Sequence, residues 1–223
     1  MDKMVYIAAS GAKQSLQGLA LKANNLANAN TTGFKADFAQ ARSMQAFGEG
    51  LPTRVFSMQE RPGSNMTSGG IIETGRDLDI AMSDNAWLAV QDDSGNEAYT
   101  KVGTLNITAQ GMLVTSHGRQ VIGEGGPVIL PVPIEKISFS EDGAIQVRPQ
   151  GAPANFLEEV DTLRVVEGNS RELEKGNDGL FRPVPGQTVD TSANVKVLSG
   201  ALEMSNVNPV HEMVDMINHQ RQF

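Results

Sequence analysis

Three polar side chains near the end of the chain have the residue types and the spacing of a metal site. His211, Asp215 and His219 follow one another at intervals of four residues, so they lie on one side of a helix. Imidazole nitrogens and carboxylate oxygens are ligands that Zn²⁺ accepts. However, the segment lacks the HExxH pattern, and eight helical residues separate the two histidines by about 12 Å, too far for one ion. We therefore expect polar contacts here rather than a metal site.

The other candidate catalytic or phosphate-binding residues give weaker evidence for a site. Residues 123–126 are rich in glycine, but Pro127 follows, whereas a phosphate-binding loop requires a helix after it, so we expect a β-turn. Asp77 and Asp79 would share one face of a strand, and we interpret them as solvated acids rather than a catalytic pair. The chain has three histidines and no Gly-x-Ser-x-Gly pattern, so no serine-hydrolase triad is predicted. The sequence indicates neither an enzyme nor a bound cofactor.

The composition argues against further classes of protein. The 223 residues carry a net charge of −8 and no run of Lys or Arg, which argues against a surface for nucleic acid or anionic membranes. Cysteine is absent, so disulfides, zinc–thiolate sites and cysteine nucleophiles are excluded. Polar side chains interrupt the N-terminal segment where a signal peptide has its apolar core, and no stretch approaches 18 apolar residues. We expect neither a cleaved signal peptide nor direct membrane insertion.

The polar residues set aside above lie within a chain whose two ends are patterned as helices. Apolar residues within the first 30 positions are spaced 4, 3, 4, 3, 4 and 3 apart, which is the heptad pattern of a helix that packs on other helices. The small size of its alanines favours close helix–helix contact over packing on a sheet. Asn30 to Gly33 then end the helix, with Gly33 suited to a left-handed conformation. The residues of this N-terminal seam are Val5, Ala9, Ala12, Leu16, Leu19, Ala23 and Leu26.

The last 23 residues, 201–223, return to helical spacing. Val207, Val210, Val214 and Ile217 step by 3, 4 and 3, and we call these four the C-terminal seam. Pro209 fits an early turn of a helix. The pattern stops at Phe223 without a capping residue, so we expect the helix to continue in a longer protein.

Between the two helices the pattern changes to short strands and turns. We expect residues 1–33 to form the N-terminal helix, 34–70 an extended linker or arm, 71–200 a β-rich domain and 201–223 the C-terminal helix. Apolar–polar alternation and hairpin turns predict an antiparallel all-β domain of irregular form. The fold class is therefore mixed: two terminal helices pairing as a coiled coil, and a central β domain. The strands expected are 77–82, 87–91, 97–101, 104–108, 112–115, 120–122, 128–130, 137–140, 144–147, 162–166 and 195–198.

Two segments, one near each end of the chain, carry a resemblance to a known family. Residues 24–35 read NNLANANTTGFK, and residues 201–210 read ALEMSNVNPV. Both resemble the terminal signatures of the bacterial flagellar rod and hook axial proteins, and each lies at the end where that family has it. The signature residues are Asn24, Asn25, Leu26, Ala27, Asn28, Gly33, Phe34, Lys35, Ser205, Asn206, Val207 and Pro209.

The central region extends the resemblance over nearly the whole chain. Residues 74–82, 99–103, 111–115 and 123–127 are similar to landmarks of the β domain of this family. The opening residues and the strand around Trp87 look like those of proximal-rod members. Distal-rod members usually have Gly-x-Gly-Phe-Phe where this chain has residues 84–88, DNAWL.

The resemblance implies a structural subunit that polymerises with copies of itself and with other rod proteins. Its terminal helices would line the channel of a rod that spans the periplasm, serving as drive shaft and export channel. Family members leave the cell through the flagellar export apparatus without a cleaved signal peptide. Two alternatives remain open. One is a distal-rod or hook subunit of the same family, and the other is a β-rich enzyme with helical oligomerisation arms.

Overall fold

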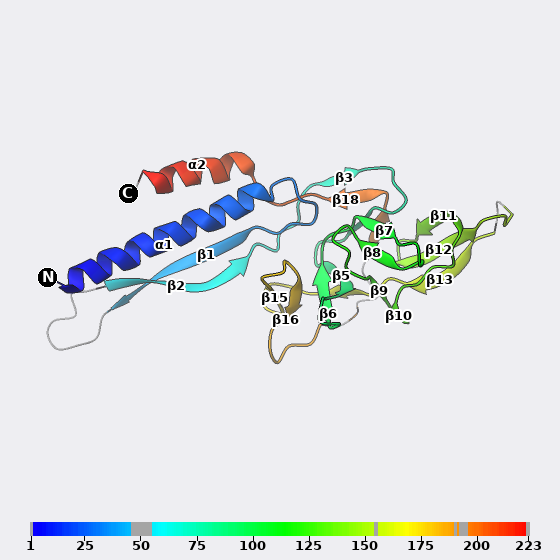
Figure 1. The fold of residues 1–223 in the computed structure, drawn as a ribbon, viewed down its shortest axis with the longest axis horizontal. Coiled ribbons are helices and arrows are strands. Elements are labelled where there is room, and N and C mark those ends of the chain that lie inside the picture. The colour runs from blue at the N-terminus through cyan, green and yellow to red at the C-terminus, as the bar shows by residue number, and fades with distance from the viewer. Residues whose placement is uncertain (1, 46–54, 154–155, 190, 192–195, 222–223) are drawn as a thin grey trace. The chain divides into compact units, whose positions relative to one another are not determined.

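The first residues of the chain form a long helix that packs with parts of the chain far away in sequence. The computed structural model describes residues 2–45, 55–153, 156–189, 191 and 196–221 (Figure 1). It divides into two units. The helical unit comprises Met1–Asn30, Lys35–Asn65 and Val207–Phe223, and the β unit comprises Thr31–Phe34 and Met66–Asn206.

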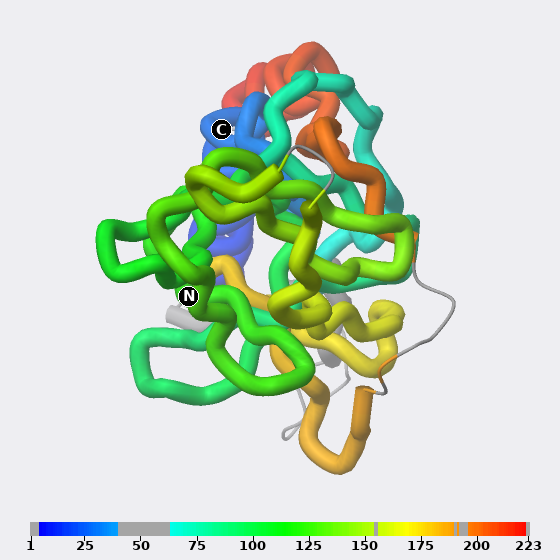
Figure 2. The backbone as a smooth tube through the Cα atoms, turned by 90° about the vertical axis from the view of Figure 1, so that its right-hand side faces the viewer, coloured from blue at the N-terminus to red at the C-terminus, as the bar shows by residue number. Residues whose placement is uncertain are grey.

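The helical unit contains two helices and one hairpin. Helix α1 (Asp2–Ala27) runs beside a hairpin of strands β1 (Asp37–Gln45) and β2 (Val55–Ser64), and helix α2 (Pro209–Gln220) lies next to α1 in both views (Figures 1 and 2). Within the segment expected as an extended linker, residues 37–45 and 55–64 therefore pair as two antiparallel strands, and residues 46–54 lie outside the described part of the chain. The hairpin packs against the side of α1, which gives regular structure to a sequence with little periodicity of its own.

The C-terminal helix begins later than expected. Residues 201–203, predicted as its first turn, form strand β18 (Ala201–Glu203), which pairs with β3 (Ile71–Glu73). The helix starts after Asn208, whose side-chain oxygen accepts hydrogen bonds from the backbone N–H groups of Val210 and His211. Pro209 occupies the first turn, where its missing N–H costs nothing. The pair Asn208-Pro209 is a cap signal that fixes the start of the helix.

The β unit is a set of small antiparallel sheets, most of whose strands are labelled in Figure 1. The largest has five strands in the order β14-β5-β6-β16-β15. A three-stranded sheet has the order β11-β12-β13, and two-stranded pairs complete the unit. The remaining strands are β4 (Ile80–Met82), β5 (Ala86–Gln91), β6 (Glu97–Thr100), β7 (Leu105–Ile107), β8 (Leu113–Thr115), β9 (Ile122–Gly123), β10 (Gly126–Pro127), β11 (Ile134–Phe139), β12 (Ala144–Pro149), β13 (Glu158–Thr162), β14 (Val165–Glu167), β15 (Leu173–Lys175), β16 (Phe181–Pro183) and β17 (Val197–Ser199).

Two groups of buried side chains hold these sheets together. The larger contains fully buried aliphatic residues from most strands, among them Leu88, Leu105 and Ile145. The smaller is built around Trp87, whose ring lies 4.4 Å from that of Phe181 and whose Nε1–H donates to the carbonyl of Gly168. Trp87 is thus a core residue, and its one polar atom is satisfied.

The prediction of two helices around a mostly β region is confirmed, and the strand boundaries differ in places. Strands β1, β2, β3, β10, β15, β16 and β18 had no counterpart in the sequence-based expectation. The predicted strand 128–130 contains one isolated bridge, at Ile129. The glycine-rich residues 123–126 form the β9–β10 turn as expected. Among the described residues, no helix is long and apolar enough to cross a membrane.

Candidate assembly interface

The two terminal helices meet through charged side chains. Lys22 Nζ of α1 lies 2.8 Å from Asp215 Oδ2 and 3.1 Å from Glu212 Oε2 of α2. Burial alone lowers the pKa of Lys22, but the hydrogen bonds to Asp215 and Glu212 outweigh it and raise that pKa above its ordinary value. The hydrogen bond from Lys22 lowers the pKa of Asp215. We call Lys22, Asn25, Glu212 and Asp215 the polar clamp.

Asn25 joins three elements within the polar clamp. Its side chain is 1% exposed and makes two hydrogen bonds of 2.9 Å to the backbone of Asp37, at the start of β1. Its Nδ2 also lies 3.4 Å from Glu212 Oε1 on α2. A buried amide needs partners for both its donor and its acceptor, and these three contacts supply them. Asn25 therefore fixes the hairpin and α2 against α1.

The histidine and aspartate spacing considered for a metal serves the same contact. Asp215 is held by Lys22, while His211 Nε2 lies 3.6 Å from Asp215 Oδ2. His219 lies against Gly18 of α1, where an added Cβ would be 3.8 Å from its Cε1. No group of three or more His, Asp or Glu in the described part of the chain could hold a metal ion. The ion pair with Lys22 accounts for Asp215, and His219 packs against α1 at Gly18.

The predicted seams lie mostly on the opposite sides of the helices from the polar clamp. Val5 is 68% exposed and Leu16 is 59% exposed, and the seam alanines 9, 12 and 23 are exposed as well. On α2, Val210 is 67% exposed and Ile217 is 54% exposed. Three seam residues differ, since Leu19 and Leu26 are half-buried and Val207 is buried. Large apolar side chains on a solvent-facing helix stripe indicate an interaction surface.

The N-terminal signature continues into a turn that belongs to the β unit. Gly33 has φ +69, and a Cβ there would lie 2.3 Å from the carbonyl oxygen of Lys101, so no other residue fits without displacement. The Phe34 ring lies 4.1 Å from Lys175 Nζ, a cation–π contact. The predicted left-handed conformation of Gly33 is confirmed.

The remaining N-terminal signature residues lie at the end of α1. Asn28 Nδ2 donates to the carbonyl of Asn24 at 3.0 Å and closes the last turn of the helix. Asn24 and Ala27 are exposed, Leu26 is half-buried, and Lys35 is buried.

The C-terminal signature holds the chain just before α2. Asn206 Nδ2 donates to the carbonyl of Thr67 at 2.9 Å, and its backbone N–H donates to the carbonyl of Phe34. Ser205 is half-buried beside it, and Pro209 opens the helix. The two signatures thus include residues that contact each other, Phe34 and Asn206, although 172 positions separate them.

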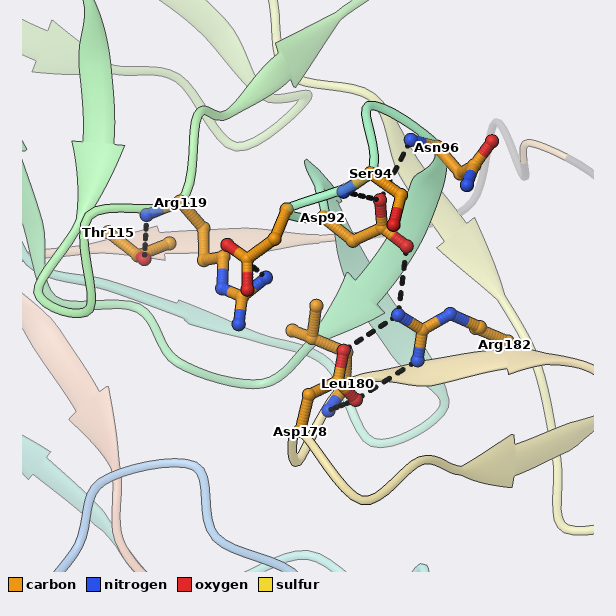
Figure 3. Close-up of polar contacts among 9 residues, drawn as sticks. Asp92, Ser94, Asn96, Thr115, Arg119, Asp178, Leu180 and Arg182 are labelled. Carbon is orange, nitrogen blue, oxygen red and sulfur yellow. Dashed lines mark hydrogen bonds and ion pairs between the residues drawn. The ribbon is translucent and has the colours of Figure 1, made fainter.

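A second polar cluster lies within the β unit. Figure 3 shows Arg182 between two carboxylates, 2.7 Å from Asp178 Oδ2 and 2.9 Å from Asp92 Oδ2. The hydrogen bond from Arg182 lowers the pKa of Asp178 to about 2 and also lowers that of Asp92. Asp92 Oδ1 accepts the backbone N–H groups of Ser94 and Asn96 as well. This cluster fixes the turn after β5 to strand β16 and is structural.

Sequence reasoning missed part of this chemistry. Asp79, interpreted as a solvated acid, is 4% exposed and accepts hydrogen bonds from Thr74 and Arg76, so that interpretation is wrong. Asp77 is exposed as expected. Lys22 and Glu212 were not singled out, because two charges 190 positions apart give no signal until the topology pairs them.

Three family models match the chain. "Flagella basal body rod protein" matches residues 5–35, "Flagellar hook protein FlgE/F/G D1 domain" matches 81–147, and "Flagellar basal body rod FlgEFG protein C-terminal" matches 198–223. The flagellar basal-body rod protein FlgF of Escherichia coli (strain K12) is 39% identical over all of this chain and 90% of its own length. The chain belongs to the flagellar basal-body rod protein family. The match at each end covers the signatures described above.

Two further relatives from the flagellar rod family have lower identity to this chain. FlgF of Caulobacter vibrioides is 32% identical over all of this chain and 90% of the relative. The rod protein FlgG of Agrobacterium fabrum is 30% identical over 99% of this chain and 91% of the relative. The family is one of structural rod proteins, so the chain is a structural subunit of the flagellar basal-body rod and not an enzyme. It assembles with other axial proteins of that rod.

Proposed function

We propose that the exposed seams of α1 and α2 are the surfaces through which this subunit polymerises. The observation that carries the proposal is the exposure of Leu16 and Val210, at 59% and 67%, on helix sides turned away from the polar clamp. Burial of apolar side chains between subunits stabilises the contact by about 25 cal/mol for each Å² of apolar surface removed from water. The exposed apolar seams of α1 and α2 are therefore buried against neighbouring subunits in the rod. A contact between unlike surfaces that does not close on itself generates a helical tube.

The helices of neighbouring subunits form a coiled coil in this proposal. The seam spacing of 3 and 4 supports it, because that spacing keeps apolar residues on one side over many turns. The polar clamp has a separate role, which is to fix the register of α1 against α2 within one subunit. Polar residues in helix contacts are well suited to that role, since they tolerate few alternative alignments.

The rod built in this way serves as a drive shaft and encloses an export channel. Its neighbours are copies of this chain and other rod proteins, and it stands in the part of the basal body that spans the periplasm. The subunit reaches that place through the flagellar export apparatus, without a cleaved signal peptide. The polar residues that interrupt the N-terminal segment support an export route of this kind.

Deletion of the gene from its host, followed by imaging of purified basal bodies and a swimming assay, tests this function. The expected result is basal bodies with an incomplete rod and cells that do not swim. Wild-type chain supplied from a plasmid restores both, whereas the double variant Leu16→Asp/Val214→Asp restores neither. Restoration by that double variant would overturn the assignment of the seams while leaving the rod assignment in place.

A further inference from the structure

Two opposite charges are buried in the β unit at the place where both terminal segments enter it. Lys101 Nζ lies 3.4 Å from Glu203 Oε2, and the two side chains are 0% and 2% exposed. Removing two charges from water costs several kcal/mol per ion, and a well-packed apolar pair is often at least as stable. Stability alone therefore gives a poor explanation of this pair.

Lys101 is held by backbone as well as by the carboxylate. Its Nζ donates to the carbonyls of Ser83 and Asp84 at 2.8 and 2.9 Å, and it lies 5.3 Å from the centre of the Trp87 ring. The ammonium is therefore held in the core by two backbone carbonyls and one carboxylate. A charge fixed in this way can orient whatever carboxylate it binds.

Glu203 in turn bonds to two other segments of the chain. Its Oε1 accepts the backbone N–H of Gly69 at 3.0 Å. Its backbone carbonyl accepts the N–H of Gly33 at 2.8 Å, in the segment that follows α1. Three residues later, the N–H of Asn206 donates to the carbonyl of Phe34 at 3.3 Å. Segments 31–34 and 203–206, which lead out of α1 and into α2, are thus bonded to each other beside the charge pair.

Lys101 touches the same place through its backbone. Its carbonyl oxygen is the atom that a Cβ at Gly33 would meet at 2.3 Å, so the two backbones are in close contact. Lys101 therefore contacts segment 31–34 directly, and it contacts segment 203–206 through its ion pair with Glu203. The chain segments at both ends of the β unit are thus positioned by the same buried lysine.

We propose that Lys101 and Glu203 are positioning residues that hold segments 31–34 and 203–206 side by side, so that the two terminal helices start in the register that polymerisation needs. The assembly part of this proposal rests on the proposed function above, whereas the effect on the two segments does not. The pair acts through the geometry of the chain ends and makes no contact with a neighbouring subunit itself.

The test uses the double variant Lys101→Met/Glu203→Gln in the full chain. Both charges disappear together, so neither is left buried alone, and the amide oxygen introduced by Glu203→Gln can still accept the N–H of Gly69. The matched control is Lys196→Met/Glu141→Gln, which makes the same changes in an ion pair whose side chains are both 78% exposed. Amide hydrogen exchange by NMR and incorporation into rods are measured for both.

We expect the amides of Gly33 and Asn206 to exchange at least about tenfold faster in the double variant, because their segments lose a fixed partner. The amide of Ala89, which donates to Arg164 in the central sheet, keeps its rate, and rod incorporation falls. The control changes neither quantity. Unchanged exchange at Gly33 and Asn206 would overturn the proposal, and so would an equal acceleration at Ala89, which would mark the pair as a stability element. Faster exchange with normal incorporation would overturn the role in assembly and leave the proposed function intact.

Discussion

Glu212 of α2 lies 3.1 Å from Lys22 of α1, so the terminal helices of one subunit meet through an ion pair. The arrangement is the reverse of a soluble helix pair, which buries apolar sides and exposes polar ones. Here the polar clamp lies inside and Leu16 and Val210 lie outside. In the function proposed above, neighbouring subunits cover the apolar sides, and the clamp aligns the two helices before those subunits bind.

Asn25 offers the first prediction, because Asn24 next to it is a control of the same residue type. Asn25→Ala leaves the backbone groups of Asp37 without their side-chain partners, and this should cost about 1–3 kcal/mol in the free energy of unfolding. Asn24→Ala, at an exposed helix position, should change it by less than about 0.5 kcal/mol. Urea denaturation of both variants makes the comparison. Equal losses would contradict the role assigned to Asn25.

Gly33 and Gly75 separate backbone strain from steric conflict. Both have positive φ, +69 and +68, but a Cβ at Gly33 meets the Lys101 carbonyl, whereas nothing lies within 4 Å of a Cβ at Gly75. Gly75→Ala should therefore cost only the strain of a left-handed alanine, about 1–2 kcal/mol. Gly33→Ala should cost clearly more, because the backbone of Lys101 or of the turn must move. Thermal unfolding measures both, and similar melting temperatures for the two variants would show that the close contact at Gly33 is unimportant.

Asp178 gives the β unit a dependence on pH. Its pKa falls from an ordinary value of 3.8 to about 2 because Arg182 donates to it in the folded state (Figure 3). A lowered pKa in the folded state adds stability that is complete above about pH 4 and disappears as the pH falls toward 2. Asp178→Asn should be less stable than the wild type at pH 7, and the two should converge near pH 2. The test is to measure the free energy of unfolding of both proteins between pH 7 and pH 2. A difference between them that stays constant over this range would argue against an ion-paired carboxylate at Asp178.

Leu16 is the residue whose replacement tests the N-terminal seam most cleanly. It is exposed, so Leu16→Asp should leave the melting temperature of the free subunit within about 2 °C of the wild type. If the seam is buried in the rod as proposed, the same charge falls in an apolar contact, and incorporation should drop at least tenfold. Gln17→Asp, one residue away on a flank of the helix, is the control that should still assemble. Normal incorporation of Leu16→Asp would show that the N-terminal seam is not an assembly surface.

The sequence predicted the helices and their apolar stripes because helical periodicity is a local property. The heptad from Val5 to Leu26 was visible in one chain, and so was the glycine turn at Gly33. What lies on the opposite side of α1 was not visible. Whether Lys22 faces water or Glu212 depends on a topology that brings the two ends of the chain together.

The unpredicted strands share a physical cause. Strand β18 has only three residues, and its backbone pairs with β3, more than 120 positions earlier in the chain. The apolar residues 201 and 202 read equally well as the start of a helix, and the pairing partner decides between the two structures. The hairpin of β1 and β2 likewise depends on α1, against which it packs, more than on alternation in its own sequence.

Polymerisation through the seams buries the exposed stripe of α1 in the proposed function, and the absence of native cysteine allows this burial to be measured directly. Leu16→Cys and, as control, Gln17→Cys, about 100° further round the helix, are each treated with a maleimide as free subunits and in purified rods. We expect the Leu16→Cys thiol to react readily in the free subunit and at least about tenfold more slowly in the rod, with a smaller change at position 17. Equal reactivity of position 16 in free subunits and in rods would contradict the burial of this stripe.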